Sequence, residues 1–282
     1  MQRQPMTRAD QRSARGRTKI TLRGELSRSA AALVSVAAVV LVLLIWQYAS
    51  AVAHWISPLI LPSPGKVAGA LGKYLGHKYL GETLIGHSIV SLKIVLGGWA
   101  MGGLVGVPLG VAIGWSQRTR WIIFPIFQVL RPIPPLAWIP LAIVWLGIGD
   151  TARIFVVFLA ALIPWVMNSI QAVDSVDTIL IKAARTLGAG SGTILASVVL
   201  RTALPTILAG ARVALGNAWM TLIAAELLAA SAGLGFVTLT SSKVLDTDIM
   251  IAAMLLIGLL GAAFAVLMRW LVRWIAPWAK GT

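Results

Sequence analysis

Long apolar runs recur along the chain, and they constrain its fold more than any other feature. A helix that crosses a bilayer needs about 20 consecutive apolar residues. We predict six such spans, at residues 30–51, 86–115, 121–148, 153–170, 206–229 and 248–270. Only 12% of the 282 residues are charged and the mean hydropathy is +0.87, which argues against a soluble enzyme. The sequence therefore predicts an all-α polytopic membrane protein with about six transmembrane helices.

The residues needed for most enzyme chemistry are missing. The chain has no cysteine, which excludes a disulfide framework, a thiolate metal site and a cysteine nucleophile. His54, His77 and His87 lack carboxylate partners at ligand spacing, so we predict no metal site. The pattern GxxxxGK[ST] is also absent. We therefore expect this chain to bind no cofactor, and any ATP and Mg²⁺ to be bound by another polypeptide.

Basic residues are distributed unevenly between the loops. The net charge is +15, but the charges gather at the ends of apolar runs and not on one solvated face, so we expect no nucleic-acid partner. Lys and Arg accumulate in cytoplasmic segments of membrane proteins. With the N-terminus inside, eight basic residues lie in the first 28 residues and eight more in the later inner segments, against five in the outer ones. Both termini are therefore predicted to be cytoplasmic, and the basic tail is an additional candidate contact for membrane lipid.

A cleaved signal peptide is the alternative for the first span. Ala51-Val52-Ala53 resembles a cleavage site. The apolar run from Ala30 to Ala53 is longer than the usual signal core of about 7–15 residues, which favours a transmembrane helix.

One long segment between spans, residues 171–205, is not hydrophobic. Asp177 is a suitable N-cap for a short helix that ends at Leu187, and Gly188 suits the left-handed position that follows a helix. We expect two short helices joined at a glycine. Ala183, Ala184 and Gly188 would let another protein approach the backbone closely, although an ordinary linker explains the pattern equally well.

This segment resembles the "EAA" loop of binding-protein-dependent ABC importer permeases, which forms the coupling helix that docks on a cytoplasmic ATPase. The pattern matches at Ala183, Ala184, Gly188, Val198 and Leu200. It departs from the family at two positions: Lys182 replaces Glu, and Arg201 replaces Pro, with Leu204-Pro205 supplying a later Leu-Pro pair. The resemblance implies ATPase coupling through Lys182, Ala183, Ala184, Gly188, Leu200, Arg201, Leu204 and Pro205.

Three further strings carry the resemblance over residues 55–275. LPSPGKV at 61–67, LRPIPPLAWIPL at 130–141 and AELLAASAGLG at 225–235 are similar to the nitrate, aliphatic sulfonate and taurine subgroup. The resemblance implies a permease homodimer with two ATPase subunits and a periplasmic solute-binding protein. The predicted spans and orientation divide the chain into a basic cytoplasmic tail (1–29), a first transmembrane helix (30–52), a periplasmic loop (53–85), a permease core (86–270) with the cytoplasmic coupling loop 171–205, and a second cytoplasmic tail (271–282).

The proline-rich stretch 130–140 and a few polar residues within spans are candidates for a translocation path. Proline removes backbone donors, and irregular backbone at membrane depth is tolerated where it lines a cavity. A structural kink in a re-entrant hairpin is the alternative. Burying an ionisable group within a membrane span costs free energy, so each such residue is a functional candidate. The alternative is that the side chain reaches the membrane interface or, for Glu226, that it pairs with an arginine. The candidates for the path are Lys93, Arg131, Pro134, Pro135, Asn217 and Glu226.

Tryptophan and glycine have distinct predicted uses. Ten tryptophans lie mostly near span ends, where we expect membrane-interface anchors. Glycines recur at spacings near four through the second span, from Gly97 to Gly110, which favours close helix packing.

The function favoured is that of an importer subunit for a small anion. The alternative is an ion-coupled transporter or channel, for which Glu226 is the available acid.

Overall fold

The computed structural model describes residues 28–53, 57 and 59–279. Nearly all of the predicted basic tail (1–29), and His54, lie outside the described residues. Within them the chain is helical and contains no strand apart from one isolated bridge between Tyr79 and Glu82. The helices are α2 (Arg28–Gln47), η1 (Tyr48–Val52), α3 (Pro64–Gly76), α4 (Leu84–Trp115), α5 (Gln117–Leu130), η2 (Pro135–Trp138), α6 (Ile139–Leu146), α7 (Asp150–Asp174), α8 (Thr178–Thr186), α9 (Ser191–Thr193), η3 (Ile194–Val199), α10 (Leu200–Ala229), α11 (Leu234–Lys243), α12 (Thr247–Ile275) and η4 (Pro277–Ala279).

The predicted all-α polytopic fold is confirmed. Five helical segments are long and apolar enough to cross a membrane: Leu33–Val52, Leu84–Trp115, Asp150–Asp174, Ser191–Leu228 and Thr247–Ile275. The pair α5 and α6 makes a sixth span if the two helices count as one, although they are bent by 84°. The predicted third span at 121–148 is therefore broken between Leu130 and Pro135. Pro132, Pro134 and Pro135 have no backbone N–H, so a regular helix cannot run through the break.

The segment 171–205 contains one separate short helix. The predicted second short helix runs through α9 and η3 directly into α10, and the apolar span begins at Ser191, not at residue 206. The last helix continues to Ile275, five residues beyond its predicted end at 270.

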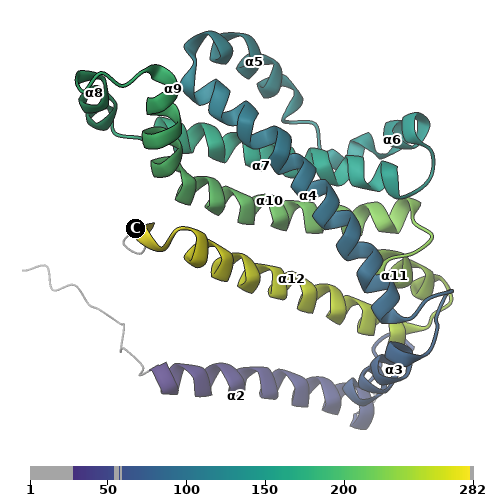
Figure 1. Ribbon diagram of the computed structural model, residues 1–282. Coiled ribbons are helices and arrows are strands. Elements are labelled where there is room, and N and C mark those ends of the chain that lie inside the picture. Colours follow the sequence, from purple (N-terminus) through teal and green to yellow (C-terminus); the bar gives the residue numbers. More distant parts are fainter. Residues whose placement is uncertain (1–27, 54–56, 58, 280–282) are drawn as a thin grey trace, which may run out of the picture.

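The core lies where α7 packs between α4 and α10 (Figure 1). Glycines permit the close approach of α4 to α7, because a Cβ at Gly98 would lie 2.6 Å from Val157 Cγ1 and one at Gly110 would lie 2.5 Å from the Val166 carbonyl oxygen. A Cβ at Gly97 would meet nothing within 4 Å. The prediction that these glycines serve helix packing is thus confirmed for the glycines of α4 that face α7, which are Gly98, Gly102, Gly106 and Gly110.

Some of the tryptophans predicted as interface anchors belong to this core. Trp165 and Trp219 are buried, and Trp99 packs beside them. The indole N–H of Trp99 donates to the Ala211 carbonyl oxygen at 3.0 Å, and that of Trp165 donates to the Trp99 carbonyl oxygen at 3.2 Å. The anchor prediction is wrong for these three residues. Glycines leave room for two of the rings inside the bundle: Gly103 and Gly106 of α4 beside Trp165, and Gly261 of α12 beside Trp219.

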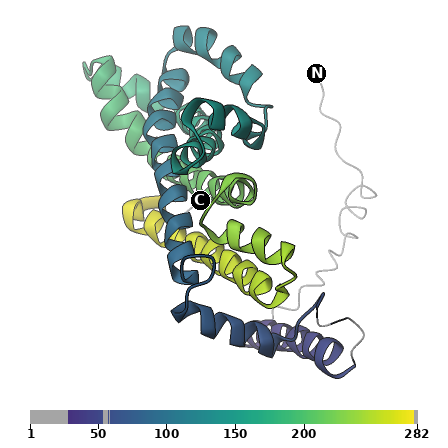
Figure 2. The same ribbon diagram turned by 90° about the vertical axis from the view of Figure 1, so that its right-hand side faces the viewer.

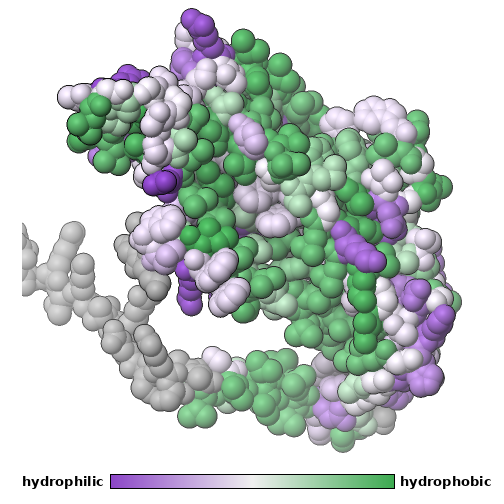
Figure 3. All heavy atoms as spheres, in the orientation of Figure 1, coloured by the Kyte–Doolittle hydropathy of each residue, from purple (hydrophilic) through white to green (hydrophobic). Residues whose placement is uncertain are grey.

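The bundle has two polar ends separated by an apolar body. Figure 3 shows hydrophobic surface over the middle and hydrophilic residues gathered toward the two ends. One end, here called the α8 end, carries α8, the start of α5 and the end of α12 (Figure 1). The opposite end, the α11 end, carries α3, α11 and the start of α7, and Figure 2 views the molecule from this side. The loops predicted to be inner thus share the α8 end, and those predicted to be outer share the α11 end.

The first helix, α2, contacts the rest of the described chain only near its C-terminal end. It lies along the edge of the molecule beside α3 (Figures 1 and 2). There the indole N–H of Trp46 donates to the Pro62 carbonyl oxygen at 3.0 Å. Its apolar side chains are exposed almost throughout, as expected of a helix surrounded by lipid.

Candidate functional site

The helix α8 projects from the bundle at the α8 end (Figure 1). None of its residues is buried. Ile181 and Ala184 pack against the core, whereas the side chain of Ile179 is 68% exposed and that of Leu187, directly after the helix, is 87% exposed. Large apolar side chains held in this way on a short polar helix suit contact with another protein.

Local hydrogen bonds define both ends of α8. A carboxylate oxygen of Asp177 accepts from the Ile179 N–H at 2.8 Å, which is the predicted N-cap. At the other end Gly188 has a φ of +83°, its N–H donates to the Arg185 carbonyl oxygen at 2.9 Å, and the next N–H donates to the Ala184 carbonyl oxygen at 3.0 Å. These two bonds form a Schellman motif. The predicted boundaries of the short helix are therefore confirmed.

The other residues predicted to couple to an ATPase lie in or beside α8 and at the start of α10. Lys182 and Ala183 are exposed on α8. Arg201 is exposed on α10, and together with Leu204 and Pro205 it lines a hollow of about 570 Å³.

The break between α5 and α6 places Arg131 and Pro134 on the surface, while Pro135 is half-buried. Arg131 and Pro135 line a cavity of about 120 Å³ with Phe127, Trp138 and residues of α7. The irregular backbone thus lies beside a cavity, and its place on a translocation path stays a prediction.

Two further candidates for the path, Lys93 on α4 and Asn217 on α10, are exposed. Within the described part of the chain, the side chains of Lys93, Arg131 and Asn217 make no hydrogen bond or ion pair. They remain free to face water, lipid or a neighbouring subunit.

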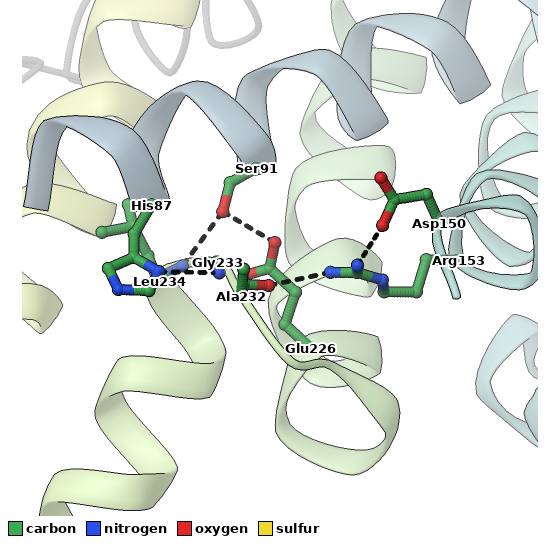
Figure 4. A network of polar contacts seen from close by, with 8 residues as sticks. All are labelled: His87, Ser91, Asp150, Arg153, Glu226, Ala232, Gly233 and Leu234. Atoms are coloured by element: carbon green, nitrogen blue, oxygen red, sulfur yellow. Dashed lines mark hydrogen bonds and ion pairs between the residues drawn. The ribbon is translucent and has the colours of Figure 1, made fainter. Parts of the chain in front are cut away.

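Glu226 occupies a different environment, near the end of α10 and inside a polar network (Figure 4). Its side chain is 1% exposed. One carboxylate oxygen accepts from the Ser91 hydroxyl at 2.7 Å, and the other accepts from the Gly235 N–H at 2.8 Å. Ser91 Oγ in turn accepts from the Leu234 N–H at 3.0 Å. Glu226 thus holds the connection between α10 and α11 against α4.

His87 extends the network by one turn of α4. The Gly233 N–H donates to His87 Nδ1 at 3.1 Å, so the ring proton lies on Nε2, which donates to the Tyr79 carbonyl oxygen at 2.9 Å. The ring is completely buried. The network continues through Tyr79 into the loop that precedes α4, outside the spans. Burial there raises the pKa of the Tyr79 hydroxyl above its ordinary value of 10.0.

Arg153 closes the network from α7. It pairs with Asp150 on the same helix, and its Nη1 donates to the Ala232 carbonyl oxygen at 2.9 Å (Figure 4). The side chain is 4% exposed. Arg153 therefore joins α7 to the loop between α10 and α11, which Glu226 and His87 contact from the other side.

Sequence reasoning missed this network. The signal available was the spacing of His87 and Ser91, which places both on one face of a helix, and the spacing of Asp150 and Arg153, which favours an ion pair. Neither spacing identifies the partners, which lie 79–146 residues away in the chain.

Apolar helices with lipid-compatible exposed surfaces, a broken helix pair beside a cavity and a short helix projecting from one polar end define the class. This chain is a multi-pass α-helical membrane protein with a short exposed helix at one end of the bundle.

Comparisons with known proteins narrow the class. Residues 106–281 match the family described as "Binding-protein-dependent transport system inner membrane component". The taurine transport system permease protein TauC of Escherichia coli K12 is 37% identical over 245 residues, covering 86% of this chain and 89% of that protein. The putative aliphatic sulfonates transport permease protein SsuC of the same organism is 35% identical, covering 83% and 87%. The bicarbonate transport system permease protein CmpB of Synechococcus elongatus is 33% identical, covering 66% and 67%.

This chain belongs to the family of binding-protein-dependent transport system inner membrane components. A solved structure of the MetNI methionine ABC transporter in an inward-facing conformation has the same fold. It matches with a TM-score of 0.61 and 23% identity, covering 67% of this chain and 95% of the other. The resemblance seen in the sequence is therefore confirmed at the level of the family, and the chain is a transport permease.

Proposed function

We propose that this permease carries a small anion inward as the membrane subunit of an ATP-driven importer. ATP and Mg²⁺ bind to a separate cytoplasmic ATPase, and a periplasmic solute-binding protein delivers the substrate. The α8 end faces the cytoplasm, with both termini on that side. This orientation is supported by the basic residues gathered there: Arg118, Arg120, Lys182, Arg185, Arg201, Arg269 and Arg273.

The geometry of α8 carries the proposal. The helix is fixed at both ends by its own caps and contacts η3 beneath it, so it can transmit force to α10. Its outer surface presents Ile179, Leu187 and the charge of Lys182. A groove on the ATPase that receives this surface would bury the two apolar side chains, and an acid in the groove would complement Lys182.

An anionic substrate is supported by the named relatives and by the charges of the spans. Those relatives are described as permeases for taurine, aliphatic sulfonates and bicarbonate, which share an anionic group. Exposed cationic groups at Lys93 and Arg131 would attract such an anion from a water-filled path.

The path runs between two copies of the chain in this proposal. One face of α10 carries Asn217 and Met220, both of them exposed in the single chain. A second copy related by two-fold symmetry would cover this face and enclose the path. Glu226 takes part indirectly, by holding the connection between α10 and α11 at the α11 end.

An ion-coupled mechanism would need an acid open to the path. Among the acids of the described spans, Asp150, Asp174 and Asp248 lie at span ends, and Glu226 lies deeper. Both oxygens of Glu226 accept hydrogen bonds inside the protein. This arrangement favours a mechanism driven by ATP.

The test is purification of the tagged chain from its host in a mild detergent, with mass spectrometry and ATPase assays of the eluate. An ATPase subunit retained in a 1:1 ratio supports the proposal. A chain that elutes alone, inactive, and that drives substrate uptake with an ion gradient would overturn it.

A matched pair of variants makes this test specific to α8. Leu187→Ser removes an apolar side chain that is 87% exposed, and Ile148→Ser removes one that is 82% exposed beyond α6, near the opposite end. We expect Leu187→Ser to lose the ATPase and Ile148→Ser to retain it. Equal retention by both variants would exclude α8 as the docking element.

A further inference from the structure

Three arginines gather along a groove between α10 and α12. Arg212, Arg269 and Arg273 line a hollow of about 600 Å³ together with Ala209, Val213 and Val272. All three side chains are exposed. The two ion pairs in the described part of the chain are Arg120 with Asp174 and Arg153 with Asp150, so none of the three has a carboxylate within 4.0 Å. Like charges placed together without an acid favour an anionic ligand.

The groove continues from its basic part into an apolar part. Arg212 also borders a second hollow, of about 190 Å³, formed between the same two helices. The rest of its lining is apolar: Leu215, Gly216, Trp219, Gly261, Phe264, Ala265 and Met268. The absence of side chains at Gly216 and Gly261 keeps this part open. A small soluble anion has no apolar part to fill this extension, whereas the acyl chain of a lipid would pack into it.

The basic part lies at the level expected of lipid headgroups. Arg273 is in the last turn of α12, and Arg269 is one turn earlier. The indole rings of Trp270 and Trp274 are exposed and stacked beside them, with centroids 6.5 Å apart and planes 3° apart. Exposed tryptophans mark the membrane–water interface, and basic pockets between transmembrane helices bind anionic headgroups.

We propose that this groove is a binding site for an anionic phospholipid. The phosphate binds between Arg269 and Arg273 with Arg212 at the deeper end, and one acyl chain lies along the apolar hollow between α10 and α12. The inference is independent of the proposed transport function, because it rests on the groove alone.

The experiment is native mass spectrometry of the purified protein titrated with dioleoyl phosphatidylglycerol, and with dioleoyl phosphatidylcholine as the zwitterionic control. We expect tighter binding of phosphatidylglycerol. Each basic side chain near an anionic membrane surface contributes about 1 kcal/mol, which is about fivefold in affinity. Arg269→Gln with Arg273→Gln should therefore weaken binding about 30-fold. Changing both arginines to lysine should retain most of the affinity.

Two further variants separate the parts of the site. Arg118→Gln removes an exposed arginine at the same end of the bundle but outside the groove, and should leave binding unchanged. Ala265→Phe should fill the apolar hollow, and so weaken phosphatidylglycerol binding while all three arginines remain.

Four results would overturn the proposal: equal binding of both lipids, an equal loss in Arg118→Gln, full binding in Ala265→Phe, or complete displacement of the lipid by millimolar inorganic phosphate. A shift from dimer to monomer in the arginine variants, with lipid binding unchanged, would instead assign the groove to a second copy of the chain. Thermal melting of each variant checks that it is folded, and the lysine variant keeps the test decisive if the glutamine variant does not fold.

Discussion

Gly188 offers the sharpest test of how α8 acts. Its φ of +83° lies in the left-handed region, and no atom lies within 4 Å of the position that a Cβ would take. Replacing it with alanine therefore adds backbone strain without a steric clash. A non-glycine residue in this conformation costs about 1–2 kcal/mol. Since 1.4 kcal/mol is a factor of ten, the capped form of α8 should become about 5–30 times less favoured.

The exposed position of α8 determines which property of the protein the backbone strain at residue 188 would change. No residue of the helix is buried, so the strain should act on the end of α8 and leave the packing of α4, α7 and α10 unchanged. We expect Gly188→Ala to insert and melt like the unchanged protein. Substrate uptake driven by ATP should fall about tenfold in proteoliposomes containing the ATPase, while ATP hydrolysis continues.

Two variants complete the experiment. Gly188→Asn should transport better than Gly188→Ala, because asparagine tolerates the left-handed conformation. Gly69→Ala alters an exposed glycine inside α3 with open space around it, and should transport normally. Normal uptake by Gly188→Ala, or an equal loss in Gly69→Ala, would refute the reasoning that the end of α8 transmits the ATPase movement.

Two further predictions concern the bundle. Gly98→Ala should lower the free energy of unfolding by about 1–3 kcal/mol, because its Cβ would lie 2.6 Å from a valine methyl of α7. Gly97→Ala should be neutral or stabilise by up to about 1 kcal/mol, since it meets open space and favours the helix. Ser91→Ala should cost about 1–3 kcal/mol by leaving a Glu226 oxygen without its partner, whereas Ser88→Ala, whose hydroxyl bonds within α4, should cost less than about 1 kcal/mol.

Reversible unfolding in mixed detergent micelles measures all four variants on one scale. Equal stability of the two glycine variants would show that α4 and α7 are not packed as closely as described. A serine pair with equal losses would show that the buried network contributes no more than a bond inside one helix.

Several features of the fold followed from local sequence. The apolar runs predicted the spans because hydropathy and length alone decide whether a helix can cross a bilayer. Asp177 and Gly188 predicted the ends of α8, since caps depend on residues within one turn of the helix. The family followed from motifs spread over most of the chain.

Other features depended on residues far apart in the chain. The spacing of glycines predicted close packing but did not identify α7 as the partner, and the prolines predicted a break but not its angle of 84°. The same limit applies to Trp165, which sequence position placed at an interface and the structure places in the core.

Glu226 shows the division most clearly. The sequence by itself determined that an acid stands near the end of an apolar helix, where it must find partners or water. Only the tertiary structure decided that the partners are Ser91 of α4, 135 residues earlier in the chain, and the Gly235 N–H in the first turn of α11. The physical reason is that hydropathy and capping are properties of neighbouring residues, whereas satisfying a buried carboxylate depends on which helices pack together.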